Sequence, residues 1–198
     1  MNFVDYTLSL IKKYGMDKKT LVVGAGFDLK NSAIDMIYKE HIPGTAYIRQ
    51  NDHDKDLAEW ITEYRNSKNF NQFDNVILSR VFEHFPARHV DWYLYSIYTI
   101  MKKGGKLICV VPNMEACAKE LENAFSGTSV DIFKVNRLNY ELLSEGDHVW
   151  DRHATWTSFG SMIYYLGMEG LFKVGTMDRI RIDSDIVPKE LEVIAIRR

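Results

Sequence analysis

The sequence alternates short runs of apolar residues with longer segments in which apolar residues recur every three or four positions. Short apolar runs are typical of buried strands, and the longer period is typical of amphipathic helices. Such an alternation predicts an α/β domain with a mostly parallel sheet, because each helix carries the chain back to begin the next strand. The expected strands are residues 21–23, 45–50, 76–78, 107–111, 172–182 and 191–196.

Helices are expected between most of these strands, with Gly and Pro residues marking several of their ends. The expected helices are residues 3–14, 28–41, 57–64, 86–101, 114–125 and 157–166. Residues 126–150 show no clear period, and we interpret them as an insertion. The last two strands have no helix between them, which suggests an antiparallel hairpin at one edge of the sheet.

The length of 198 residues fits a single domain that spans residues 1–198. Hydrophobic residues make up 46% of the chain and charged residues 26%, which excludes a disordered, collagen-like or disulfide-stapled protein. The formal net charge of -2 is not basic enough to argue for a nucleic-acid partner on charge alone, and none is expected.

The two cysteines, Cys109 and Cys117, lack the spacing of metal ligands. We interpret them as reduced core residues, and no metal site is predicted. The N-terminal segment is too polar for a signal peptide, and no apolar run approaches the ~20 residues of a membrane span. We therefore expect a soluble cytoplasmic protein that does not bind a membrane, and leave open a homo-oligomer or a protein partner.

A glycine turn, Gly24-Ala25-Gly26, follows the first expected strand and precedes a helix. Glycine lets the backbone approach a ligand closely, and a helix N-terminus offers free amide groups to an anion. The alternative is a tight turn with no ligand. The third glycine of the dinucleotide fingerprint is missing, which argues against a nicotinamide-dependent oxidoreductase.

Beyond the turn, the chain carries Phe-Asp before an apolar strand, then Glu83-His84-Phe85, and a Lys-Lys-Gly-Gly turn before a strand that ends in Val-Pro-Asn. Gly-Leu-Phe-Lys-Val follows near the end. From about residue 21 onward this order resembles the class I S-adenosylmethionine-dependent methyltransferases, in particular a small group with Glu-His after the fourth strand. The resemblance implies a three-layer, doubly wound, mostly parallel seven-stranded sheet with a C-terminal antiparallel hairpin.

The resemblance also implies S-adenosylmethionine as the cofactor and assigns residues to it. These cofactor-binding residues are Gly24, Ala25, Gly26, Asp28, Asn51, Asp52, Asp56, Ser79, Arg80 and Glu83. Asp28 has an alternative role as a helix N-cap, and residues 51–56 have the alternative of a solvated, charged loop. The family usually carries an acid where this chain has Val22.

Three ionisable residues are candidates for proton transfer: His84, Asp151 and His153. Histidine suits this task because its ordinary pKa lies near neutral pH. Methyl transfer needs a base only when the acceptor must lose a proton, since the main requirement is to align acceptor and methyl group. The alternative is structural: His84 fixes the loop after the strand, and Asp151 and His153 brace the insertion.

The acceptor is expected to be a small molecule. Amino-directed DNA methyltransferases that resemble this fold carry Asn/Asp-Pro-Pro-aromatic after the fourth strand, whereas residues 79–82 here read Ser-Arg-Val-Phe. The N-terminal helix, within residues 1–18, and residues 126–150 are expected to form a lid over the acceptor. The competing hypothesis is a binding or scaffold protein that keeps the fold and has lost the cofactor. The tyrosines and tryptophan of residues 92–98 and the tyrosines of 164–165 are predicted to pack in the core or against a partner.

Overall fold

A computed structural model describes residues 6, 9–15, 18–23, 46–48, 66, 71–126, 130, 132–143, 153–180 and 190–198. Six strands lie in one sheet in the order β2-β1-β3-β4-β6-β5. Their bounds are β1 (Thr20–Val23), β2 (Ala46–Ile48), β3 (Phe73–Ser79), β4 (Met101–Pro112), β5 (Phe172–Ile180) and β6 (Glu190–Arg197). The α/β class is confirmed.

The strands β1 to β4 run parallel, and β6 is antiparallel to both of its neighbours, β4 and β5. All six strands predicted from the pattern are present. The expectation of seven strands is wrong for the described part of the chain, because it came from the resemblance and no further apolar run supports it. Residues 181–189, which join β5 to β6, lie outside the described residues, so the hairpin stays a prediction.

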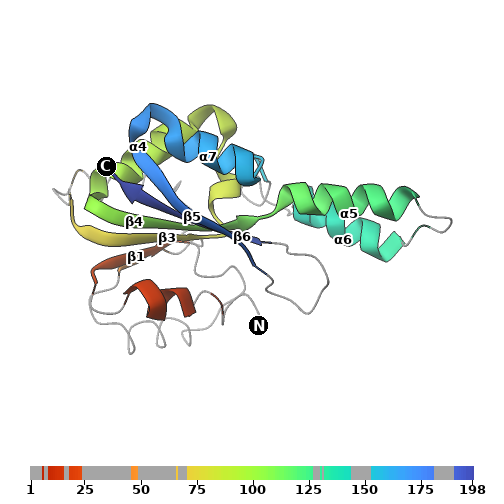
Figure 1. The fold of residues 1–198 in the computed structure, drawn as a ribbon, viewed down its shortest axis with the longest axis horizontal. Coiled ribbons are helices and arrows are strands. Elements are labelled where there is room, and N and C mark those ends of the chain that lie inside the picture. The colour runs from red at the N-terminus through yellow and green to blue at the C-terminus, as the bar shows by residue number, and fades with distance from the viewer. Residues whose placement is uncertain are drawn as a thin grey trace.

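Helices lie on both faces of the sheet (Figure 1). Their bounds are η1 (Ile11–Gly15), η2 (Phe82–His84), η3 (Ala87–His89), α4 (Val90–Ile100), α5 (Met114–Ser126), α6 (Ile132–Leu143), α7 (Phe159–Gly167) and η5 (Met168–Gly170). Helix α7 begins with a capping box, in which the Ser158 hydroxyl accepts the Ser161 amide hydrogen at 3.2 Å. The expected helices at 28–41 and 57–64 fall outside the described residues.

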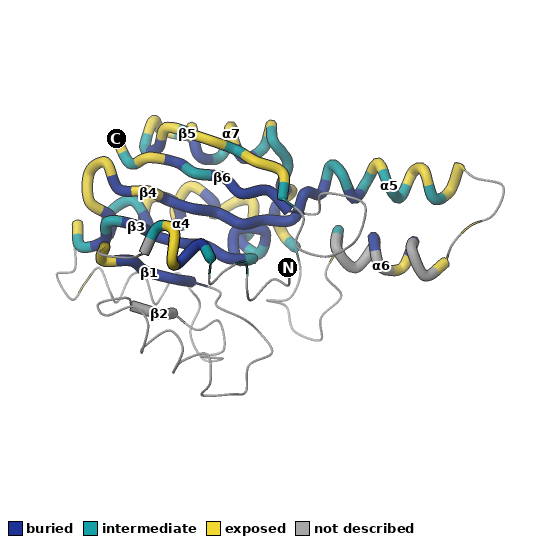
Figure 2. The backbone as a smooth tube through the Cα atoms, turned by 60° about the horizontal axis from the view of Figure 1, so that its bottom comes forward, coloured by how far each residue is buried: buried dark blue, intermediate teal, exposed yellow. Residues whose placement is uncertain are grey.

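Each face of the sheet is covered by its own hydrophobic layer, because side chains alternate along a strand. Val76 and Leu78 of β3 point into the larger layer beneath α4 and α7. Ile77, between them, packs with Leu10 and Ile11 of the N-terminal segment on the opposite face. The central strands β1 and β3 and the second half of β4 are therefore buried on both sides, as the dark blue tube in Figure 2 shows. With helices on both faces, the described part of the chain forms the three layers expected of it.

Two local predictions differ from the structure. Residues 132–143 form helix α6, although no period was assigned there. The Lys102–Gly105 segment lies inside β4 as an irregularity in its pairing with β3 instead of forming a turn before the strand. At this irregularity the register moves from Phe73 opposite Met101 to Asn75 opposite Lys106.

Helices α5 and α6 pack side by side and project from the end of β4, away from the sheet (Figures 1 and 2). We call residues 114–143 the arm. Asn113 caps α5, since its side-chain oxygen accepts the amide hydrogen of Ala116 at 3.2 Å. The arm contains the whole of the predicted helix 114–125 and residues 126–143 of the predicted insertion.

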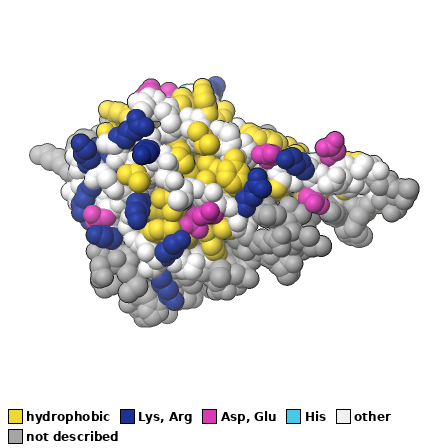
Figure 3. Space-filling view, in the orientation of Figure 1, with side chains coloured by type: hydrophobic (Ala, Val, Ile, Leu, Met, Phe, Trp, Pro, Cys, Tyr) yellow, Lys and Arg dark blue, Asp and Glu magenta, His cyan; other side chains and the backbone are white. Residues whose placement is uncertain are grey.

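The aromatic residues of α4 and α7 divide between core and surface. Tyr93 is buried, and Tyr98 and Tyr165 pack against the larger hydrophobic layer, as predicted. Trp92, Tyr95 and Tyr164 are exposed, so for these three the alternative of packing against a partner stays a prediction. On the face drawn in Figure 3, hydrophobic side chains gather near the middle, with Lys and Arg side chains around them. Within the described residues, every helix is too short or too polar to cross a membrane.

Candidate functional site

The carboxyl ends of four parallel strands meet at one edge of the sheet. Val23 at the end of β1 lies opposite Ile48 of β2 on one side and Leu78 of β3 on the other. The chain continues from β1 to β2 and only later returns to β3, so the strand order reverses between β1 and β3. In open α/β sheets, ligands bind in the crevice outside the carboxyl ends of the strands at such a reversal.

The chain turns sharply as it leaves β3 at this edge. Arg80 adopts a left-handed backbone conformation with φ of 57°, and its amide donates to the Val110 carbonyl of β4 at 2.9 Å. Few residues other than glycine adopt this conformation, which marks a position where the surrounding structure dictates the path. The turn directs the chain into η2, which carries Glu83 and His84.

Glu83 joins η2 to a segment that lies 70 residues further along the chain. Its backbone carbonyl accepts the amide hydrogens of Ala154 at 2.8 Å and of Thr155 at 2.9 Å. The Thr155 hydroxyl in turn donates to the Phe85 carbonyl. These bonds place His153 beside η2.

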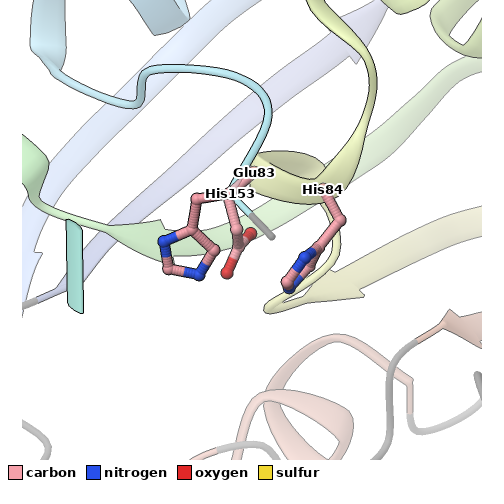
Figure 4. A group of neighbouring side chains, drawn as sticks. All are labelled: Glu83, His84 and His153. Atoms are coloured by element: carbon pink, nitrogen blue, oxygen red, sulfur yellow. The ribbon is translucent and has the colours of Figure 1, made fainter. Parts of the chain in front are cut away.

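The side chains of Glu83, His84 and His153 form one group, which we call the Glu-His-His cluster. One ligand atom from each lies within 4.8 Å of the others. The two imidazole ring centroids are 5.1 Å apart at 67°, an edge-to-face arrangement. Figure 4 shows the Glu83 carboxylate between the two rings, with all three side chains pointing to the same side. Imidazole and carboxylate together can move a proton or ligate a metal ion.

Glu83 is 0% exposed, and both imidazoles are partly buried. The Arg80 guanidinium lies between two acids, with its Nε 3.4 Å from Glu83 Oε1 and its terminal nitrogen 2.7 Å from Glu190 Oε1. A buried carboxylate needs such contacts because removing it from water is costly. Burial, with the nearby Glu83 carboxylate, raises the pKa of the Cys109 thiol well above its ordinary range, so this cysteine stays protonated.

The structure brings together four of the residues predicted from the sequence: Arg80, Glu83, His84 and His153. Ser79 is buried at the end of β3, opposite Val110. The remaining predicted site residues lie outside the described residues: Gly24, Ala25, Gly26, Asp28, Asn51, Asp52, Asp56 and Asp151.

Glu190 belongs to this site and was not predicted. It begins β6 in the pattern Glu-Leu-Glu-Val, which is typical of a strand with one face in water. Both Glu190 and Glu192 are only 6% exposed, because Arg80 and the N-terminal segment cover that face. The signal in the sequence was two acids at alternate positions of the last expected strand. Their burial follows only from contacts with Arg80 and Tyr14, which lie far away along the chain.

Several solved methyltransferase structures share this fold. A methyltransferase from Archaeoglobus fulgidus superimposes with a TM-score of 0.59 at 13% identity, over 98% of this chain and 94% of that one. A Listeria monocytogenes structure described as a putative methyltransferase gives 0.57 at 13% identity, over 99% and 98%.

The 1,6-didemethyltoxoflavin-N1-methyltransferase of Burkholderia thailandensis, solved with bound S-adenosylhomocysteine, gives a TM-score of 0.58 at 10% identity. That alignment covers 98% of this chain and 77% of the other. No protein-family model matches the chain, and no curated protein matches it in sequence. The predicted resemblance is therefore confirmed at the level of architecture: the chain has the α/β fold of the S-adenosylmethionine-dependent methyltransferases.

Proposed function

We propose that this protein is an S-adenosylmethionine-dependent methyltransferase that acts on a small-molecule acceptor. The observation that carries the proposal is the edge where β1 and β3 end side by side, in a chain with the methyltransferase fold. The Glu-His-His cluster follows β3 at this same edge. Ligand binding at a strand-order reversal is the general behaviour of such sheets, and it supports a cofactor site there.

The cofactor site includes the glycine turn that follows β1. Residues 24–26 continue directly from Val23, which pairs with Leu78 of β3. Glycine at positions 24 and 26 would permit the close backbone approach that an adenosyl cofactor needs. Asp28, Asn51, Asp52 and Asp56 remain the proposed polar contacts, together with Ser79, Arg80 and Glu83.

When bound, S-adenosylmethionine would supply a methyl group on a sulfonium sulfur, which would keep the electron pair of the C–S bond when the methyl group is transferred to the acceptor atom. The chain's own residues hold the acceptor in line and remove its proton. His84 or His153 accepts that proton at an imidazole nitrogen, and the Glu83 carboxylate between the rings stabilises the resulting imidazolium. Asp151 is proposed to orient the His153 imidazole.

Calorimetric titration with S-adenosylhomocysteine tests this proposal. We expect binding with one ligand per chain, and we expect Gly24→Val to weaken it by at least tenfold because a side chain would fill the approach path. The matched control is Gly160→Val in α7, where a new Cβ meets nothing within 4 Å. Absence of heat at millimolar ligand, with the protein folded by circular dichroism, would contradict cofactor binding.

A second candidate is a protein of this fold that no longer binds the cofactor. The observation that favours it is Val22, which is 0% exposed and packs in the smaller hydrophobic layer, at a position where an acid is usual. A protein that gives no heat with S-adenosylhomocysteine, yet stays folded, would support this second candidate. Release of S-adenosylhomocysteine in a screen of small hydroxyl and amine acceptors would support the enzyme.

A further inference from the structure

We propose that Glu83, His84 and His153 form a binding site for a divalent transition-metal ion. The proposal rests on the juxtaposition of one carboxylate and two imidazoles whose ligand atoms lie within 4.8 Å of one another. It does not rest on methyl transfer, and an ion held there would replace the proton-accepting role of the two histidines, because an imidazole nitrogen that ligates a metal cannot also accept a proton. Nothing in the spacing of Glu83, His84 and His153 along the sequence suggested it.

The donor set selects the class of metal. Two imidazole nitrogens and one carboxylate oxygen suit Zn²⁺, Fe²⁺ and Co²⁺, whereas Mg²⁺ and Ca²⁺ prefer sites made of oxygen atoms alone. Three protein ligands leave at least one coordination position for water or another ligand, as in catalytic zinc sites. In Figure 4 the three side chains point to one side, so that position lies at the carboxyl edge of the sheet.

The observed separations are compatible with binding after a small movement. Bonds of ~2.0–2.2 Å in a tetrahedral site place ligand atoms about 3.3–3.6 Å apart, so the widest pair here has to close by at most about 1.5 Å. The two histidines are only partly buried, which leaves their rings room to rotate. Their backbones are held, since the His84 amide donates to the Val81 carbonyl at 3.0 Å and the His153 amide donates to the Leu143 carbonyl at 3.3 Å.

The electrostatics of the cluster favour a cation. Glu83 is fully buried, and Glu190 is held near it through the shared Arg80. The guanidinium lies 2.7 Å from Glu190 and 3.4 Å from Glu83, so its tighter contact is with Glu190. A metal ion beside Glu83 would offset part of the cost of keeping this carboxylate out of water.

The test uses the full chain without a histidine tag, stripped of metal with a chelator and then titrated with Zn²⁺ against a fluorescent zinc indicator. We expect one ion per chain. His84→Ala and His153→Ala should each weaken binding by more than about 100-fold, because loss of even an outer-shell partner of a metal ligand costs about 10–100-fold. Substitution by Co²⁺ should give a visible absorption spectrum that both variants lose.

His89→Ala is the matched control, since His89 is exposed on η3, outside the cluster and only five residues from His84. It should bind Zn²⁺ as the unmodified protein does. Glu83→Gln keeps the size of the buried side chain and should also weaken binding, with circular dichroism to verify the fold. Absence of stoichiometric binding, or binding that His84→Ala and His153→Ala leave unchanged, would overturn the proposal.

Discussion

The ionisation of Asp74 is coupled to folding at the level of a single side chain. Burial by itself raises the pKa of this carboxyl, but Lys102 lowers it through contacts at 2.8 and 2.9 Å, and the Lys19 amide lowers it further at 3.1 Å. The net pKa lies below its ordinary value of 3.8. A depressed pKa adds stability that is present above the unfolded-state pKa and is lost as pH falls through the folded-state pKa.

We predict that Asp74→Asn lowers the free energy of unfolding by about 0.5–1 kcal/mol at pH 7, since the contact with Lys102 is partly exposed. The difference between variant and unmodified protein should shrink as the pH falls below about 4, where the unfolded-state carboxyl is protonated first and the folded-state carboxyl follows at lower pH. Urea denaturation at pH 7 and at pH 3 measures both. Glu122→Gln, on the exposed side of α5, is the control; an Asp74→Asn effect that stays constant with pH would contradict the prediction.

At the scale of elements, the irregularity in β4 depends on one glycine. A Cβ on Gly105 would lie 2.8 Å from the Lys102 carbonyl oxygen and 2.9 Å from the Asp74 carbonyl oxygen. Both are backbone atoms, which cannot rotate out of the way as a side chain can. Gly160 in α7 offers the opposite case, because a Cβ there meets nothing within 4 Å.

We predict opposite effects for the same substitution at these two positions. Gly105→Ala should destabilise the protein by about 1–3 kcal/mol through overpacking. Gly160→Ala should stabilise it by roughly 0.5–1 kcal/mol, because alanine loses less backbone entropy than glycine in a helix. Thermal and urea unfolding of the two variants measure the effects, and equal shifts of the same sign would refute the role given to Gly105.

The elements show where sequence patterns suffice. Strands were predictable because runs such as Val76–Leu78 are buried on both faces and need no alternation. Helix α6 was missed although Val135 and Leu138 are buried three residues apart, because polar residues around them obscure the period. The Lys102–Gly105 segment was predicted as a turn because Gly-Gly is a turn signal, and only pairing with β3 shows that β4 already begins at Met101.

At the scale of the whole molecule, both hydrophobic layers depend on the same central strand. Ile77 and Leu78 are each 0% exposed and point to opposite faces of β3. A disruption on either face therefore reaches the other through the shared sheet. Because both hydrophobic layers pack on the same strand, we expect them to unfold together.

We predict that Ile77→Ala and Leu78→Ala each lower the free energy of unfolding by about 2–5 kcal/mol, the cost of truncating a large buried side chain. Each variant should still unfold in a single transition. Tryptophan fluorescence and far-ultraviolet circular dichroism, recorded across the same urea series, should give coincident curves. Curves that separate would show that the two layers unfold independently.

The candidate site was only partly predictable, because it is assembled from distant parts of the chain. Glu83 and His84 were identified from a local motif, and His153 was proposed separately. Their meeting depends on backbone hydrogen bonds from residues 154 and 155 to the Glu83 carbonyl, which no local pattern encodes. The burial of Glu190 likewise depends on Arg80, 110 residues earlier in the chain.

Thr157 joins the segment that follows the arm to the end of β4, where the arm begins. Its hydroxyl donates to the Pro112 carbonyl at 2.6 Å, and its own carbonyl accepts the Met114 amide hydrogen at 3.0 Å. The residues where the chain leaves the sheet and where it returns are thus joined directly, whatever the length of the segment between them. We therefore expect helical turns added to or removed from the arm to leave the register of β4 in the sheet unchanged.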